Sequence, residues 1–161
     1  MTQDVVLGGT FGPLHDGHRE MLRTAFEVGS PTIGITSDSL ARKTRDEPRY
    51  IPSAEEKRKT ILKYECEKLA EEFDREYTIE IIDHPIQKAV KEKRFDTIVL
   101  SPEEKVDERV AIINEKRAKN GYEPLDTVYA DMVEAEDGER ISSTRIINGE
   151  IDEHGAIIEW G

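Results

Sequence analysis

Short apolar runs alternate with segments of helical periodicity along the whole chain. The pattern of a buried strand occurs in residues 5–7, 32–36, 77–82, 97–100 and 127–132. Helical spacing or helix-capping residues occur in residues 17–28, 53–73, 85–94, 101–120 and 142–149. Because parallel strands need a crossover segment between them, this alternation predicts one α/β domain, in which helices cover both faces of a five-stranded parallel sheet.

Capping residues mark several of the predicted helix ends. Residues 53–56 (Ser-Ala-Glu-Glu) have the spacing of a capping box, and residues 101–104 (Ser-Pro-Glu-Glu) combine an N-cap serine with a proline at the first helical position. Glycines at 29, 121 and 149 can end the helices before them. In the helix over residues 53–73 we expect one buried face, formed by Ile61, Leu62, Leu69 and Phe73.

Residues 1–150 are expected to form the domain, and residues 151–161 a short tail. The tail contains Ile157, Ile158 and Trp160, which could dock it on the domain. The basic residues 42–52 include Pro48 and Pro52 and are predicted to form a loop.

Composition excludes several classes of protein. Lys and Arg number 23 and Asp and Glu 35, so the net charge of −12 disfavours nucleic acid and anionic membranes as partners. No apolar run approaches the roughly 18 residues of a membrane span, and residues 1–4 lack the features of a signal peptide. The single cysteine, Cys66, can form neither an internal disulfide nor a cysteine metal cluster. We therefore expect a cytoplasmic protein.

The turn after the first strand is the most informative segment for function. It contains Gly8 and Gly9 and continues to His15 and His18 at the start of the first helix. Ligands of open α/β sheets bind at the carboxyl ends of the strands, and a helix N-terminus favours phosphate. Two histidines three residues apart could donate to the same phosphate group. They could instead be surface residues or half of a metal site, whose other ligands would come from Cys66, His84, His154 or carboxylates.

Two motifs resemble those of the nucleotidyltransferase superfamily. Residues 9–18 (Gly-Thr-Phe-Gly-Pro-Leu-His-Asp-Gly-His) contain the His-x-Gly-His motif, and residues 141–146 (Ile-Ser-Ser-Thr-Arg-Ile) are similar to its second motif. Within the superfamily the chain resembles phosphopantetheine adenylyltransferases of the archaeal and eukaryotic type over residues 1 to about 153. Supporting stretches lie at residues 36–38, 42–43, 99–103, 113–117 and 135–138. The resemblance implies a Rossmann-like fold.

The resemblance also implies roles for individual residues. His18 would donate to the α-phosphate of ATP, with His15 beside it, and Lys43 would lie next to the reacting phosphates. Thr10, Lys43 and Arg58 would hold the phosphate of the acceptor. The nucleotide would contact both motifs, through Gly8, Gly9, Thr10, Phe11, His15, His18, Ser142, Ser143, Thr144 and Arg145. Mg²⁺ would be bound mainly by the ATP phosphates, so no metal-binding side chains are expected.

The expected reaction is transfer of AMP from ATP to 4′-phosphopantetheine, which gives dephospho-coenzyme A and pyrophosphate. One alternative keeps this chemistry with another acceptor, such as nicotinamide mononucleotide, FMN or a cytidylyl acceptor. Another is a module that binds ATP without turnover. Residues 101–103 (Ser-Pro-Glu) stand where the bacterial enzymes have Arg-Gly, so their substrate contacts at that place are not carried over.

Overall fold

The computed structural model describes residues 3–43, 54–102 and 106–159. Five strands are present in this part of the chain: β1 (Gln3–Gly9), β2 (Gly29–Thr36), β3 (Thr78–Ile82), β4 (Thr97–Leu100) and β5 (Asp126–Tyr129). The helices are α1 (Asp16–Val28), α2 (Asp38–Lys43), α3 (Glu55–Phe73), α4 (Gln87–Lys91), α5 (Val106–Lys119) and α6 (Ser143–Ile147).

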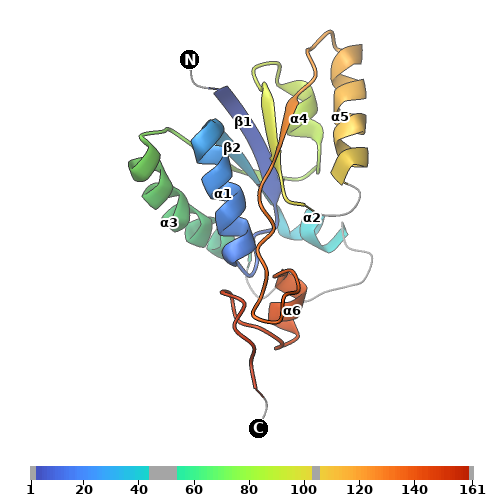
Figure 1. Ribbon diagram of the computed structural model, residues 1–161. Helices are drawn as coiled ribbons and strands as arrows, with labels where there is room; N and C mark the ends of the chain where they lie inside the picture. The colour runs from blue at the N-terminus through green and yellow to red at the C-terminus, as the bar shows by residue number, and fades with distance from the viewer. Residues whose placement is uncertain (1–2, 44–53, 103–105, 160–161) are drawn as a thin grey trace.

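The five strands form one parallel sheet in the order β3-β2-β1-β4-β5. The chain builds outward from β1 to β3 and then returns to the other side of β1, so the strand order reverses next to β1. In such sheets the crevice at the carboxyl ends of the strands near this reversal is the usual ligand site. Figure 1 shows α6 and the C-terminal segment at that end of the sheet, and the N-terminus at the opposite end.

Helices cover both faces of the sheet, as the sequence predicts (Figure 1). Alternate residues of β1 point to opposite faces. Val5 and Leu7 belong to a core cluster with residues of α1 and α3, whereas Val6 belongs to a second cluster with residues of α4 and α5. The fold is therefore the three-layer α/β arrangement that the sequence predicts.

The predicted elements differ from the structure mainly at their ends. β2 begins at Gly29 rather than Thr32, and α4 covers only Gln87–Lys91 of the predicted 85–94. β5 ends at Tyr129. Ser101 and Pro102 are not helical, α5 is described from Val106, and residues 103–105 of the predicted helix lie outside the described residues. Residues 42–43, predicted as loop, belong to α2. This helix was missed because its apolar residues, Leu40 and Ala41, are adjacent rather than periodic, although both are buried.

The helix α3 has a narrower buried face than expected. Leu62 is fully buried, and Leu69 and Phe73 pack against the same cluster, but Ile61 is 40% exposed, so its predicted burial is wrong. The buried face instead includes Arg58 and Cys66. Burial raises the pKa of the Cys66 thiol to about 12. The predicted cap Ser53 and the tail residue Trp160 lie outside the described residues.

A buried arginine links the end of α5 by hydrogen bonds to the segments around it. The Arg117 guanidinium donates to the carbonyl oxygens of Ala89, Glu92, Phe95 and Glu123, and its burial lowers its pKa from the ordinary value. After the helix, Gly121 turns the chain with a φ of 77°, and nothing lies within 4 Å of where its Cβ would be. This turn connects α5 to β5 at the amino ends of the strands.

A third, smaller core cluster lies at the site end of the sheet. It contains the buried residues Ala135, Ile141 and Ile151. The residues expected to dock the tail, Ile157 and Ile158, are 44% and 38% exposed. The residue of this segment that is buried against the domain is Ile151. No helix in the described part of the chain has the length and apolar character needed to cross a membrane.

Candidate active site

The start of α1 is capped by the two histidines of the first motif. His15 is the N-cap, and its Nδ1 accepts a hydrogen bond from the Gly17 N–H at 3.0 Å. In return, His18 Nδ1 accepts from the His15 N–H at 3.2 Å. The two side chains thus form the reciprocal arrangement of a capping box, with histidine in both roles. Their rings stack at a centroid distance of 3.8 Å.

These contacts fix the protonation of the two rings. A ring nitrogen that accepts from a backbone N–H carries no proton, so in this geometry the ring proton of each imidazole is on Nε2. Each Nε2 is then a hydrogen-bond donor. The backbone N–H groups of His15, Asp16 and Gly17 donate within the protein, and both imidazoles line the cavity beside them.

Phe11 also contacts the His18 ring. Its own ring is 2% exposed, lies 5.1 Å from the His18 ring centroid and is held by a backbone with φ of 52°. A Cβ on Gly9 would lie 3.3 Å from the Phe11 ring, so the turn has little space for a side chain there. The glycine and the aromatic residue together set the orientation of His18.

Arg58 lies beneath the turn instead of among the residues that line the cavity. Its side chain is 1% exposed and donates to the carbonyl oxygens of Thr10 at 2.7 Å and Thr36 at 3.0 Å, and to Asp38 Oδ1 at 3.0 Å. Thr36 Oγ1 also donates to Thr10 Oγ1 at 3.0 Å. The structure therefore places Arg58 where it holds the carboxyl ends of β1 and β2 together, which differs from the expected contact with the acceptor.

The second motif forms the start of α6. Ser142 is the N-cap, and its Oγ accepts from the Arg145 N–H at 3.3 Å. The Ser143 hydroxyl donates to the Pro13 carbonyl oxygen at 3.1 Å, across 130 residues of sequence. The structure thus joins the two motifs directly, as expected for two segments that act on one ligand.

A cavity of about 440 Å³ lies between the two motifs and the carboxyl ends of the strands. Of the residues predicted to bind the nucleotide, all but Arg145 line it: Gly8, Gly9, Thr10, Phe11, His15, His18, Ser142, Ser143 and Thr144. The charged residues that line its described part are Lys88, Arg109, Arg140 and Asp131. Cationic side chains thus outnumber carboxylates in the lining of an acidic protein, which favours an anionic ligand.

The cationic lining residues were missed from the sequence. Lys88 and Arg109 occur in charged segments that resemble solvated helix faces, and only the position of Arg140 next to the second motif could have indicated it. Burial opposes the charged form of Lys88, but hydrogen bonds to Glu80 and Glu92 outweigh it and raise the pKa of the ammonium. Lys88 is therefore charged at neutral pH. The side chain of Lys43 lies outside the described part of the structure.

Arg145 points away from the cavity. Its guanidinium pairs with Asp137 and with Glu150, and it donates to the Arg140 carbonyl oxygen at 3.2 Å. The hydrogen bond from Arg145 holds the pKa of Asp137 below its ordinary value. The structure thus places Arg145 among contacts that hold the loop before α6, outside the residues that line the cavity.

Replacement of Arg145 by alanine is expected to change the KM for ATP by less than about twofold. The variant should be less stable at neutral pH. A carboxylate with a lowered pKa stabilises the fold above its ordinary pKa of about 4, and this stabilisation is lost as the pH falls through the lowered value. The difference in Tm between wild type and Arg145→Ala should therefore be larger at about pH 7 than at about pH 3. A large rise in KM would contradict this placement.

Comparison with known proteins identifies the family of this chain. A model described as cytidylyltransferase-like matches residues 6–149. A phosphopantetheine adenylyltransferase from Methanosarcina acetivorans is 44% identical in an alignment of 156 residues that covers 94% of this chain and 93% of that one. The chain belongs to the phosphopantetheine adenylyltransferase family. The family member from Archaeoglobus fulgidus is 38% identical over 96% of this chain and 99% of its own length.

A solved structure has a similar fold. It is a protein of unknown function from Archaeoglobus fulgidus, 30% identical, with a TM-score of 0.64 over 80% of this chain and 90% of that chain. The family model covers residues 6–149 of the chain and so includes both motifs. The cavity between these motifs is therefore the candidate active site.

Proposed function

We propose that the protein transfers AMP from ATP to 4′-phosphopantetheine and releases pyrophosphate, forming dephospho-coenzyme A. The observation that carries this proposal is the 44% identity to a phosphopantetheine adenylyltransferase over more than nine tenths of both chains. The cavity supports it, because two stacked imidazoles lie there beside the start of α6. A cap of α1 requires only one acceptor nitrogen of each ring, so the second nitrogen of each imidazole has no part in the cap.

The reaction is a direct in-line displacement. An oxygen of the acceptor phosphate forms a bond to the α-phosphorus of ATP, and the bond from that phosphorus to the oxygen bridging the α- and β-phosphates breaks. Pyrophosphate leaves with the electron pair, and no covalent enzyme intermediate is required. Catalysis then depends on placement of the reactants and on donors aimed at the charge that grows on the α-phosphate oxygens.

In this mechanism His18 Nε2–H donates to an oxygen of the α-phosphate, and His15 supplies a second donor beside it. Ser142, Ser143 and Thr144 hold the β- and γ-phosphates. Lys43 is proposed as the cation beside the acceptor phosphate. For Arg58 we propose a positioning role: it holds the Thr10 carbonyl at 2.7 Å and so fixes the turn that carries the histidines.

The cavity also has a wall suited to the uncharged part of phosphopantetheine. Apolar residues from β3, α4, the segment between them and β4 line it: Ile82, Pro85, Ala89, Ile98 and Leu100. A mostly apolar wall with a few polar groups at one end is typical of sites for elongated small molecules. We propose that the pantetheine arm lies along this wall, with its phosphate toward the histidines.

Mg²⁺ is proposed as the companion of ATP. Within residues 3–43, 54–102 and 106–159, no group of three or more His, Cys, Asp or Glu side chains could hold a metal ion. Mg²⁺ bound to a nucleotide is commonly held mainly by phosphate oxygens and water. When bound, it would neutralise part of the triphosphate charge. We place the reaction in the cytoplasm, where ATP and Mg²⁺ are abundant.

The test is pyrophosphate release from ATP and Mg²⁺, with 4′-phosphopantetheine or nicotinamide mononucleotide supplied separately, and with CTP in place of ATP in a parallel series. We expect turnover with ATP and 4′-phosphopantetheine alone. Turnover only with the other acceptor, or only with CTP, would reject the proposed substrates and leave nucleotidyl transfer standing. Measurable ATP binding without turnover in any combination would indicate a nucleotide-sensing module instead.

A further inference from the structure

Residues 151–157, termed here the C-terminal loop, pack against the residue that begins the second motif. Ile151 is fully buried in a cluster with Ala135 and Ile141, and Ile141 directly precedes Ser142. Gly155 has a φ of 84°, and a Cβ there would lie 2.9 Å from Ile141 Cδ1. The loop therefore fits closely against the chain that leads into α6.

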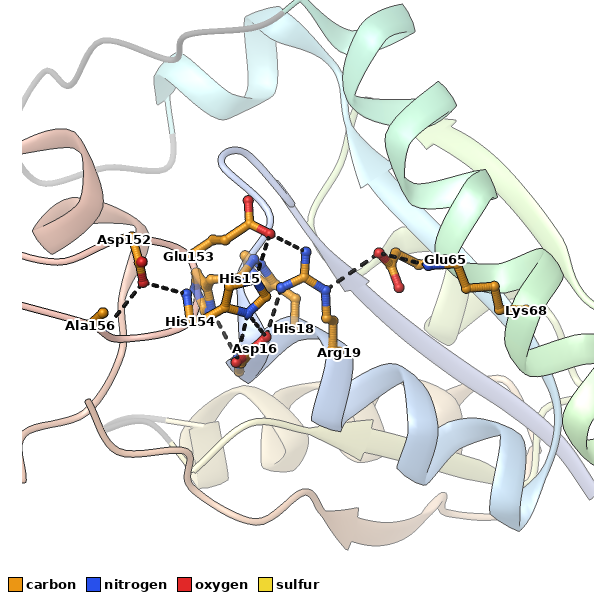
Figure 2. Close-up of polar contacts among 11 residues, drawn as sticks. His15, Asp16, His18, Arg19, Glu65, Lys68, Asp152, Glu153, His154 and Ala156 are labelled. Carbon is orange, nitrogen blue, oxygen red and sulfur yellow. Dashed lines mark hydrogen bonds and ion pairs between the residues drawn. The ribbon is translucent and has the colours of Figure 1, made fainter. Parts of the chain in front are cut away.

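The same loop contacts the start of α1 between the two histidines. The Asp16 N–H donates to the Glu153 carbonyl oxygen at 3.0 Å. The Asp16 carboxylate oxygens lie 3.0 and 3.1 Å from His154 Nδ1 (Figure 2). Asp16 separates His15 from Gly17 and His18, so the loop holds the chain within the first motif itself.

Arg19 extends this connection to α3. Its guanidinium donates to Asp16 at 2.7 Å, to Glu153 at 2.9 Å and to Glu65 at 3.4 Å (Figure 2). One cation thus joins the C-terminal loop, α1 and α3. With these contacts, the start of α1 has little freedom to move relative to the loop.

The loop is itself held in shape by Asp152. Its Oδ1 accepts from the N–H groups of His154 and Ala156, each at 2.9 Å, and its own N–H donates to the Ala156 carbonyl oxygen at 3.0 Å. These backbone donors hold the pKa of the Asp152 carboxyl below its ordinary value. The turn therefore presents Glu153 and His154 to α1 in a fixed orientation.

We propose that the C-terminal loop is a brace that sets the distance between the two phosphate-binding motifs, with Glu153 and His154 as positioning residues for the transfer reaction. They act through Asp16 and Arg19 on His15 and His18. This inference rests on the proposed function, because the distance matters only if both motifs hold the same triphosphate. Displacement of a catalytic group by about 1 Å can lower a rate a hundredfold.

The brace predicts that rate and stability respond differently to substitution. His154 is 62% exposed, and an exposed polar contact of this kind contributes little to stability. His154→Ala is expected to lower kcat about five- to tenfold and to speed exchange of the Asp16 amide hydrogen, with Tm within about 2 °C of wild type. His154→Asn should recover most of the activity, because its amide nitrogen can occupy the position of Nδ1 and donate to Asp16.

Glu159→Ala is the matched control, since Glu159 is an exposed residue just beyond the loop. If His154→Ala matches Glu159→Ala in both kcat and Asp16 exchange, the brace is rejected. Faster exchange without a loss of kcat also rejects it, because the positioning role is then absent. A loss of kcat with faster exchange, reversed by asparagine, supports it.

Gly155→Ala tests the brace at its contact with the second motif. The added Cβ would lie 2.8 Å from Ala135 Cα and 2.9 Å from Ile141 Cδ1, so the loop must shift away from the second motif. We expect kcat to fall at least as far as in His154→Ala. Full activity with the loop displaced would reject the brace.

Failure of the proposed function can be distinguished from failure of the brace. If the wild type transfers nothing to 4′-phosphopantetheine, the proposed function fails, and the brace is judged on Asp16 exchange and on ATP affinity measured by calorimetry. Neither measurement requires an acceptor. Faster exchange with weaker ATP binding in His154→Ala supports the brace, and unchanged values reject it.

Discussion

Replacement of His18 by asparagine is expected to lower kcat by about 10²- to 10³-fold, because a donor to the charge that develops in the transition state is lost. The asparagine side chain still offers an oxygen near the position of Nδ1, so it can accept from the His15 N–H and keep the cap of α1. The donor at the position of Nε2 disappears. Pyrophosphate release under saturating substrates measures the loss.

The comparison with His18→Ala separates catalysis from capping. Alanine removes both the Nε2 donor and the capping acceptor, so it should show a similar loss of kcat and, in addition, a loss of about 0.5–2 kcal/mol in the free energy of unfolding. His18→Gln, whose amide nitrogen can reach the position of Nε2, should retain more activity than either. If asparagine leaves kcat near that of wild type, His18 acts as a cap alone.

Removal of the Arg58 side chain should cause the second large effect. Arg58→Ala leaves the Thr10 and Thr36 carbonyl oxygens and part of the Asp38 carboxylate without their donor and opens a cavity beneath the turn. Breaking a buried charged network of this kind costs about 3–5 kcal/mol, so we expect a loss of that size in the free energy of unfolding. Denaturant unfolding measures it.

Two further variants test this interpretation of Arg58. Gly12→Ala should reproduce part of the loss, because a Cβ on Gly12 would lie 2.5 Å from Arg58 Cδ and displace the guanidinium. Lys57→Ala removes an exposed cation one residue away on α3 and should leave stability within about 0.5 kcal/mol of wild type. A stable Arg58→Ala protein with a raised KM for the acceptor would instead restore the direct substrate contact expected from the sequence.

The sheet could be predicted from the sequence because its strands are continuous apolar runs. Val5 and Leu7 face one side and Val6 the other, and a strand that is buried on both faces shows this pattern without any tertiary information. Helix starts were less predictable. The first turn of α3 is capped by the Asp38 carboxylate, 17 residues earlier in the chain, which accepts from the Glu55 N–H at 3.0 Å. A local search for capping residues cannot find such a contact.

The candidate site was predictable where a motif places several groups together. His15, His18 and Ser142 could be selected because their spacing in the sequence reflects their position at helix starts. The arginines could not be sorted in this way. Arg58, Arg140 and Arg145 all stand in charged or motif segments, and only the folded chain shows that one is buried, one lines the cavity and one turns to Asp137. Side-chain direction depends on contacts across the fold.

The turn at Gly121 offers a practical consequence of the parallel sheet. Every connection from a helix to the next strand lies at the edge opposite the cavity, and the Gly121 turn has open space around it. A fluorophore or surface anchor attached there would leave the substrate entrance clear. The protein could therefore be immobilised in one orientation, with each molecule presenting its binding face to the solution.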